Sequence, residues 1–127
     1  MTIMNGYQQY KQQSVDTMTS GEMLILLFDG AVKNITLAEL ALQKQNYAEF
    51  DVAITKTDKI IRYLRATLNM QYPISRDLDR LYEYFLYLLT RLRAGRKQEI
   101  ITELKGHLVD LRDTFKEADR IAANQHR

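Results

Sequence analysis

The hydrophobic pattern of the chain is strongest at residues 23–28, where six apolar residues follow directly after a helix-start signal. Thr19 can act as the N-cap, and Glu22 stands three residues later, where its carboxylate can reach back to the N-cap backbone N–H. An amphipathic surface helix needs an apolar stripe only about 100° wide. Six consecutive residues point in all directions around the axis. The first long helix, predicted at residues 20–43, therefore has more apolar surface than one core stripe requires.

Within this first helix, one set of apolar positions repeats with the helical period and the others are surplus. The predicted core stripe consists of Leu24, Leu27, Ala31, Ile35 (or Val32), Ala38 and Leu42. The surplus consists of Met23, Ile25, Leu26, Val32, Leu37 and Leu40. Gly30 costs about 1 kcal/mol relative to alanine inside a helix, so we expect another helix or a ligand backbone to approach closely at this position.

Three further stretches, at residues 47–68, 76–94 and 97–122, predict helices with apolar stripes of their own. Asn46 and Ser75 are the expected N-caps of the second and third helices, and Pro73 separates the two. Gly95 is expected to end the third helix in left-handed geometry. Short connections favour antiparallel neighbours. The predicted fold is all-α: an antiparallel up-down-up-down four-helix bundle over residues 19–123, with a mobile or short-helical N-terminal arm at residues 1–18 and a frayed tail at residues 124–127.

The composition indicates one soluble domain without disulfide or thiol chemistry. The chain has 127 residues, one proline and no cysteine, which fits a reducing cytosol. The N-terminus lacks the basic and apolar regions of a secretory signal, and no apolar run approaches the roughly 20 residues that span a bilayer. We therefore expect a cytoplasmic protein without membrane insertion.

The net charge of +2 is unevenly distributed. Residues 62–97 contain eight arginines and lysines against three acids, a local charge of +5, so the rest of the chain carries −3. Nucleic-acid-binding domains usually show a denser basic surface. Within this span Arg80, Tyr82, Tyr84, Tyr87 and Arg91 could in principle hold nucleic acid. A solvated face is the favoured interpretation, with the tyrosines at the core boundary and their hydroxyls in water.

The sequence gives little support to catalysis. The histidines are His107 and His126, whereas di-iron sites in helical bundles need paired Glu-x-x-His units on facing helices. Glu103 and His107 form a single i, i+4 pair, and a boundary position is the favoured interpretation of His107. The sequence contains no glycine-rich phosphate loop and no defensible serine–histidine–aspartate arrangement. We predict that the protein is not an enzyme and uses no metal or cofactor.

The polar N-terminal arm contains two tyrosines, Tyr7 and Tyr10, together with Val15. The tyrosines are either incidental parts of a loose tail or groups that dock on the bundle as a lid. The lid hypothesis accounts better for two aromatic side chains in a polar, glutamine-rich segment.

A series of short motifs runs through residues 7–118 in a recognisable order. After the N-terminal tyrosines come Val15-Asp16-Thr17, Gly21-Glu22-Met23-Leu24, Leu27-Phe28-Asp29-Gly30-Ala31, Leu68-Asn69, Tyr72-Pro73-Ile74-Ser75, Leu81-Tyr82 and Leu111-Arg112-Asp113-Thr114-Phe115. Together these motifs resemble the FliS family of flagellin-specific export chaperones. Two positions depart from the family pattern: Met18-Thr19-Ser20 replaces a common Ala-Ser-Pro, and Phe28 stands where tyrosine is common.

This resemblance implies a cytoplasmic helical bundle that binds the disordered C-terminal segment of newly made flagellin. Such chaperones prevent premature polymerisation and deliver flagellin to the export gate of the flagellar type III apparatus. The expected partners are therefore flagellin and a flagellar export gate protein, with other flagellar regulators as further candidates. The resemblance also implies that the N-terminal segment covers part of the binding surface in the absence of flagellin.

The surplus apolar surface and the family resemblance together suggest a groove that receives one or more amphipathic helices of flagellin. The candidate groove residues are Leu24, Phe28, Ile61, Tyr63, Leu64, Leu68, Asn69 and Tyr72, and the candidate lid residues are Tyr7, Tyr10 and Val15. Asn69 would offer its amide to the flagellin backbone, and Arg62 and Arg65 would attract an acidic partner. Two alternatives stay open: a structural homodimeric bundle that buries the surplus against a second copy, and a small nucleic-acid-binding bundle.

Overall fold

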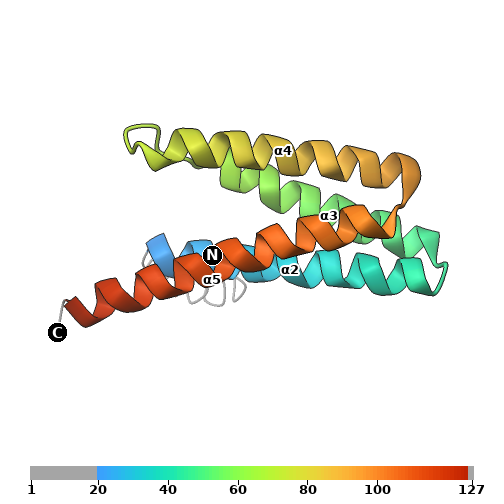
Figure 1. Cartoon of the computed structure of the whole chain (residues 1–127), viewed down its shortest axis with the longest axis horizontal. Coiled ribbons are helices and arrows are strands. Elements are labelled where there is room, and N and C mark those ends of the chain that lie inside the picture. The colour runs from blue at the N-terminus through green and yellow to red at the C-terminus, as the bar shows by residue number, and fades with distance from the viewer. Residues whose placement is uncertain (1–19, 126–127) are drawn as a thin grey trace, which may run out of the picture.

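The computed structural model describes residues 20–125, with side chains for residues 21–124, and this part of the chain is built from four helices. They are α2 (Ser20–Gln43), α3 (Tyr47–Ala66), α4 (Ile74–Gly95) and α5 (Gln98–Gln125). Successive helices run in opposite directions (Figure 1), which confirms the predicted all-α antiparallel bundle. The predicted arm at residues 1–18 and the predicted N-cap Thr19 lie outside the described residues. None of the four described helices is long and apolar enough to cross a membrane.

The start of α3 agrees with the sequence prediction, but its end and the start of α4 do not. The Asn46 side chain accepts a hydrogen bond from the Glu49 backbone N–H at 3.2 Å, as expected for an N-cap. The α3 helix ends at Ala66 rather than at residue 68. Pro73, not Ser75, is the N-cap residue of α4, because a missing N–H costs nothing where a helix begins. The Ser75 hydroxyl instead donates to the Asn69 carbonyl at 2.6 Å and closes the connection.

The connection between α4 and α5 also differs from the prediction. Arg96, with a φ of 48°, adopts the left-handed conformation assigned to Gly95, which is the last residue of α4. The Arg96 guanidinium lies 4.6 Å from the centre of the Tyr47 ring and 3.3 Å from the Asp51 carboxylate. These contacts offset the cost of about 1–2 kcal/mol that a side chain incurs in this conformation. The α5 helix continues to Gln125, beyond the predicted end at residue 122.

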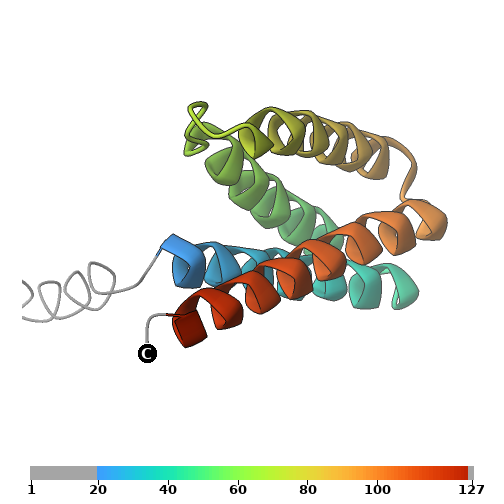
Figure 2. The same cartoon turned by 60° about the vertical axis from the view of Figure 1, so that its left-hand side comes forward.

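The four helices do not pack evenly along their lengths. The α2 helix packs against α3 and α5, whereas α4 packs mainly against α3. Phe28, Phe50, Phe85 and Leu104 are among the fully buried side chains that join these pairs. Figure 2 shows α3 and α4 diverging from α2 and α5 toward the end of the bundle where α2 begins. The two helix pairs are therefore furthest apart around the first turns of α2.

Gly30 lies where α3 approaches α2 closely. A close approach was expected here because glycine destabilises the interior of a helix. A Cβ atom added at Gly30 would lie 3.3 Å from the Ile60 Cδ1 atom, which is tighter than an ordinary van der Waals contact. The prediction of a close approach at this glycine is confirmed. A larger side chain at position 30 would have to push α3 away from α2.

We predict that Gly30→Phe lowers the free energy of unfolding by about 1–3 kcal/mol, the usual cost of overpacking. Urea unfolding followed by circular dichroism measures this change. Gly106→Phe is the matched control, because a Cβ at Gly106 meets nothing within 4 Å. Equal stability of the two variants would contradict a packing role for Gly30.

Candidate functional site

An apolar groove opens at the end of the bundle where the two helix pairs diverge. Its volume is about 540 Å³, and residues from all four helices and from the α3–α4 connection line it. We call it the tyrosine groove. Its lining consists of Met23, Leu24, Leu27, Tyr63, Leu64, Thr67, Leu68, Asn69, Tyr72, Ile74, Ser75, Leu78, Tyr82 and Phe115.

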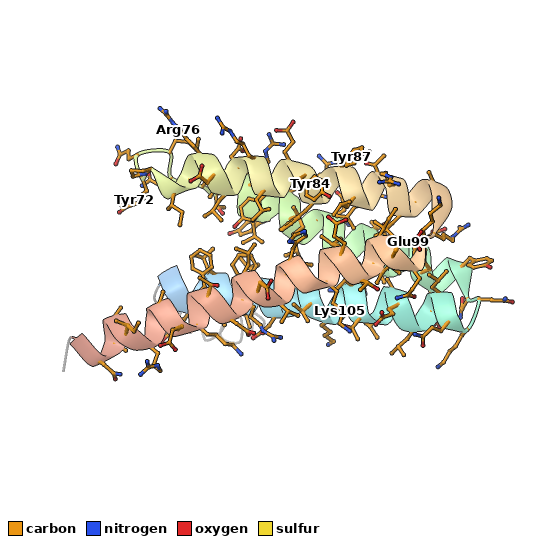
Figure 3. The ribbon with its side chains drawn as sticks, in the orientation of Figure 1. Tyr72, Arg76, Tyr84, Tyr87, Glu99 and Lys105 are labelled. Atoms are coloured by element: carbon orange, nitrogen blue, oxygen red, sulfur yellow. The ribbon has the colours of Figure 1, made fainter. Side chains whose placement is uncertain are left out.

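Six of the eight groove residues predicted from the sequence line this one groove: Leu24, Tyr63, Leu64, Leu68, Asn69 and Tyr72. Leu24 comes from α2 and the other five from the end of α3 and the connection that follows it. Tyr63 is 53% exposed and Tyr72 is 62% exposed. Figure 3 shows Tyr72 at the tip of the bundle where α3 joins α4. Exposed tyrosines thus stand beside an apolar groove, where they can contact a further chain.

The other two predicted residues, Phe28 and Ile61, lie in the core and do not line the groove. Both side chains are fully buried. The Phe28 ring stacks on Phe115, with 5.4 Å between ring centres, and Phe115 is a groove residue. Phe28 therefore supports the groove from below instead of forming its surface. The periodicity of the first helix could not separate these two roles, because the six apolar residues at 23–28 point in all directions.

Asn69 holds the α3–α4 connection in shape beside the groove. Its side-chain Oδ1 accepts a hydrogen bond from the Gln71 backbone N–H at 3.0 Å. Its backbone carbonyl accepts from the Tyr72 N–H at 3.1 Å as well as from the Ser75 hydroxyl. The Oδ1 atom of the Asn69 side chain is thus already hydrogen-bonded within the turn. The Nδ2 donor is the half that Asn69 can offer to a bound chain.

Tyr82 is the most informative groove residue that the sequence did not suggest. It is fully buried, although a hydroxyl in water was expected, so that prediction is wrong. Within the described residues its hydroxyl has no hydrogen-bond partner. Burial raises the pKa of the Tyr82 phenol to about 12. The groove therefore has in its wall a neutral hydroxyl whose hydrogen bond is not made by this part of the chain.

The other unpredicted groove residues are mostly apolar neighbours of predicted ones. Met23 and Leu27 flank Leu24 on α2, and Ile74 follows Pro73 at the start of α4. Leu78 comes from α4 and Phe115 from α5. Ile74 could have been found from its position, because an apolar residue in an exposed connection is seldom needed for the core.

The two arginines expected to attract a partner are already engaged near the groove. The Arg62 Nε atom lies 2.6 Å from the carboxylate of Asp58, which also contacts Arg93 at 3.3 Å. The Arg65 Nε atom lies 2.8 Å from Asp79, and this hydrogen bond raises the pKa of the Arg65 guanidinium. The Asp58–Arg93 and Arg65–Asp79 pairs join α3 to α4, whereas Arg62–Asp58 lies within α3. Together these pairs leave less positive charge free for a partner.

The Glu103–His107 pair has the contacts of a boundary position. The His107 Nε2 atom lies 3.3 Å from the Glu103 carboxylate, and the imidazole ring stacks on Phe85. The Tyr84 hydroxyl donates to Glu103, and this hydrogen bond lowers the pKa of that carboxyl. Among residues 20–125, no three histidine, aspartate or glutamate side chains gather as metal ligands would.

The fold and the groove together define a class of protein. An antiparallel helical bundle with an open, tyrosine-lined apolar groove has the features of a module that binds an amphipathic helix. Comparison with known proteins identifies the family more closely: the sequence model described as "Flagellar protein FliS" matches residues 3–122. The chain therefore belongs to the FliS family of flagellar secretion chaperones.

Named relatives from three bacteria support this assignment. The flagellar secretion chaperone FliS of Bacillus subtilis (strain 168) is 31% identical over 93% of this chain and 89% of the relative. FliSB of Pseudomonas aeruginosa is 25% identical over 88% of this chain and 94% of its own length. FliS of Salmonella typhimurium is 26% identical over 98% of both chains. The similarity thus covers nearly the whole length of each protein.

We predict that the buried Tyr82 hydroxyl makes stability fall at high pH. The phenol has a pKa of about 12 in the fold and about 10 in the unfolded chain, so the unfolded state loses its proton first. Neutral Tyr82 makes its full contribution to the free energy of unfolding below pH 10. This contribution is lost as the pH rises from 10 to 12, by up to about 1.4 kcal/mol per pH unit.

Urea unfolding at several pH values measures this dependence, with Tyr82→Phe as the comparison. Tyr82→Phe should lose less stability between pH 10 and 12 than the parent chain. At neutral pH the same variant should be at least as stable, because it removes a buried hydroxyl that has no hydrogen-bond partner among the described residues. Identical pH profiles for the two proteins would contradict the buried state of this phenol.

Proposed function

We propose that the protein is an export chaperone that holds the C-terminal segment of flagellin in the tyrosine groove. The observation that carries this proposal is the convergence of all four helices on one open apolar groove with two exposed tyrosines at its side. We choose flagellin as the bound protein, the client, because of family membership, since the relatives are named flagellar secretion chaperones. A chaperone of this kind keeps flagellin from polymerising in the cytoplasm before export.

The groove has the surface that a folding client needs. A disordered segment that folds on binding must bury apolar area to offset its ordering cost. Tyr63, Tyr72 and Ile74 are each more than half exposed beside the groove, so they can be covered without opening the core. Leu24 and Leu68 are partly buried against the core cluster. We assign the binding contacts to these five residues, with Leu64 and Asn69 beside them and Phe28 and Ile61 as the support beneath.

We further propose that the N-terminal arm covers the tyrosine groove when flagellin is absent. Tyr7, Tyr10 and Val15 lie outside the described residues. The proposal is supported by the position of the groove next to Met23 and Leu24, in the first turns of α2, so the arm joins the bundle beside it. Arm and client would then compete for the same apolar surface.

The loaded chaperone has further partners in this proposal. A flagellar export gate protein receives the complex, and other flagellar regulators are additional candidates. Two different functions were considered from the sequence, a homodimeric structural bundle and a nucleic-acid-binding bundle. Sedimentation that stays monomeric at high concentration would exclude the first. Absence of any salt-dependent binding to nucleic acid would exclude the second.

We predict that the chaperone binds full-length flagellin and loses it when the C-terminal segment of flagellin is removed. Combining Tyr63→Ala with Tyr72→Ala should weaken binding of full-length flagellin at least tenfold, or about 1.4 kcal/mol, because both rings are exposed beside the groove. Pull-down and isothermal titration calorimetry measure the two effects. Equal recovery of full-length and truncated flagellin would contradict the proposed mode.

The control for these substitutions is Tyr87→Ala. Tyr87 is 55% exposed, similar to Tyr63, but it lies on α4 outside the groove lining, and Figure 3 shows it far along α4 from Tyr72. Its removal should leave flagellin affinity unchanged. A similar loss of affinity in this variant would assign the client to another face.

We predict that deletion of residues 1–18 increases the binding of an apolar fluorescent dye to the flagellin-free protein, because the groove loses its cover. The rise should disappear when flagellin is added. Circular dichroism of the deletion variant verifies that the four helices remain. Unchanged dye fluorescence in a folded deletion variant would contradict the lid.

A further inference from the structure

A second groove lies at the other end of the α2–α3 pair, near the turn that joins these helices. Its volume is about 500 Å³. We call it the lysine groove, and it is lined by Asn34, Leu37, Leu40, Ala41, Lys44, Ala48, Glu49, Val52, Ala53 and Lys56. The turn between α2 and α3 is at the right-hand end of the bundle in Figure 1. The lysine groove and the tyrosine groove have no residue in common.

The three large apolar side chains of the lysine groove lie outside the buried core. Leu37 is 47% exposed, Leu40 is 45% exposed and Val52 is 55% exposed. These three residues come from two neighbouring helices and point into one concave surface. Leu37 and Leu40 belong to the apolar surplus of the first helix, for which the tyrosine groove gives no explanation.

Two lysines line this apolar surface and two more lie one helical turn from lining residues, and none of the four has an ion-pair partner among the described residues. Lys44 and Lys56 line the groove. Lys33 precedes Leu37 by one helical turn, and Lys59 follows Lys56 by one turn; both are exposed. None of the four takes part in an ion pair within the described part of the chain.

Most acidic residues between positions 33 and 59 form ion pairs with residues outside the groove lining. Glu39 contacts Lys105 on α5 at 3.1 Å. Asp51 contacts Arg96, and Asp58 contacts Arg62 and Arg93. Glu49 is the acid in the groove lining. Residues 33–59 contain four lysines and four acidic residues. Because three of these acids contact cations outside the groove, the groove itself carries positive charge.

We propose that the lysine groove binds an amphipathic helix with acidic residues beside its apolar stripe, and that this helix belongs to a partner other than flagellin. The apolar stripe would cover Leu37, Leu40 and Val52, in the manner of helix-in-groove recognition. Carboxylates on its flanks would meet Lys44 and Lys56, which favours acidic helices and speeds their association. Because the two grooves share no residue, this partner and the flagellin segment can be bound together.

Charge and shape favour this occupant over two others. A symmetric dimer through this face would place the lysines of one copy near those of the other, since a two-fold interface joins identical surfaces. An anionic membrane would also attract lysines, but a bilayer surface is flat and the apolar residues lie in a concavity between two helices. An acidic helix fits both the concave shape and the charge.

The test uses the full chain labelled with ¹⁵N and two synthetic amphipathic helical peptides. The peptides have the same leucine stripe, and their flanking residues are all glutamate in one and all lysine in the other. The glutamate peptide should shift the backbone amide signals of Leu37, Leu40 and Val52. It should bind at least tenfold more tightly than the lysine peptide, with a difference that shrinks as salt is raised.

Charge reversal provides the matched variants. Lys44→Glu combined with Lys56→Glu should invert the preference, so that the lysine peptide binds more tightly. Arg76→Glu combined with Arg80→Glu is the control, because these exposed arginines lie on α4 and also have no ion-pair partner within the described residues. The control should keep the original preference for the glutamate peptide.

Several results would overturn the proposal. The first is equal affinity for the two peptides. The second is an unchanged preference for the glutamate peptide after Lys44 and Lys56 are replaced by glutamate. The third is a shift of backbone amide signals at the tyrosine groove instead of the lysine groove. Displacement of the glutamate peptide by the flagellin C-terminal segment would assign the lysine groove to the client. Tighter binding of anionic phospholipid vesicles than of the glutamate peptide would assign it to a membrane, and peptide-free dimers abolished by Leu40→Glu would assign it to a second copy. Failure of flagellin to bind the tyrosine groove would leave this test unaffected.

Discussion

The close approach of α2 and α3 at Gly30 is the contact on which both grooves depend. The Ile60 Cδ1 atom lies only 3.3 Å from the position that a Cβ at Gly30 would take. Toward the start of α2, residues 23–27 and the end of α3 border the tyrosine groove. Toward the end of α2, residues 34–44 and the start of α3 border the lysine groove. A glycine that weakens the isolated helix by about 1 kcal/mol thus fixes the spacing from which both surfaces are built.

The same buried layer stabilises the bundle and supports the tyrosine groove. Phe28 is fully buried, yet its stacking partner Phe115 lines the groove. Tyr82 is fully buried in the groove wall, and its hydroxyl, which has no hydrogen-bond partner among the described residues, lowers the stability of this part of the chain. A change to these rings would therefore affect folding and binding together. The exposed rings of Tyr63 and Tyr72 can be changed with less effect on the core, so they can separate the two properties.

Sequence periodicity predicted four helices and the surplus on α2, and together with the family resemblance it named six of the fourteen residues that line the tyrosine groove. It could not decide which apolar residues a neighbouring helix covers, because coverage depends on where the helices diverge. Phe28 and Ile61 were expected at the groove and are buried, whereas Tyr82 was expected in water and is buried as well. The end of α3, the start of α4 and the left-handed residue after α4 were misplaced where tertiary contacts decide the local conformation. Arg96 adopts the left-handed position beside Gly95 because Tyr47 and Asp51 hold its side chain.

Charge shows most clearly what the sequence leaves open. Residues 62–97 have the highest positive charge in the sequence, yet in the fold Arg65, Arg93 and Arg96 contact acids. Two of these acids, Asp51 and Asp58, come from the earlier segment that also contains the four unpaired lysines. Ion pairs between helices thus remove negative charge from one segment and positive charge from the other. Only the fold identifies which cations have no ion-pair partner among the described residues, and those beside the lysine groove lie outside the region whose sequence is most basic.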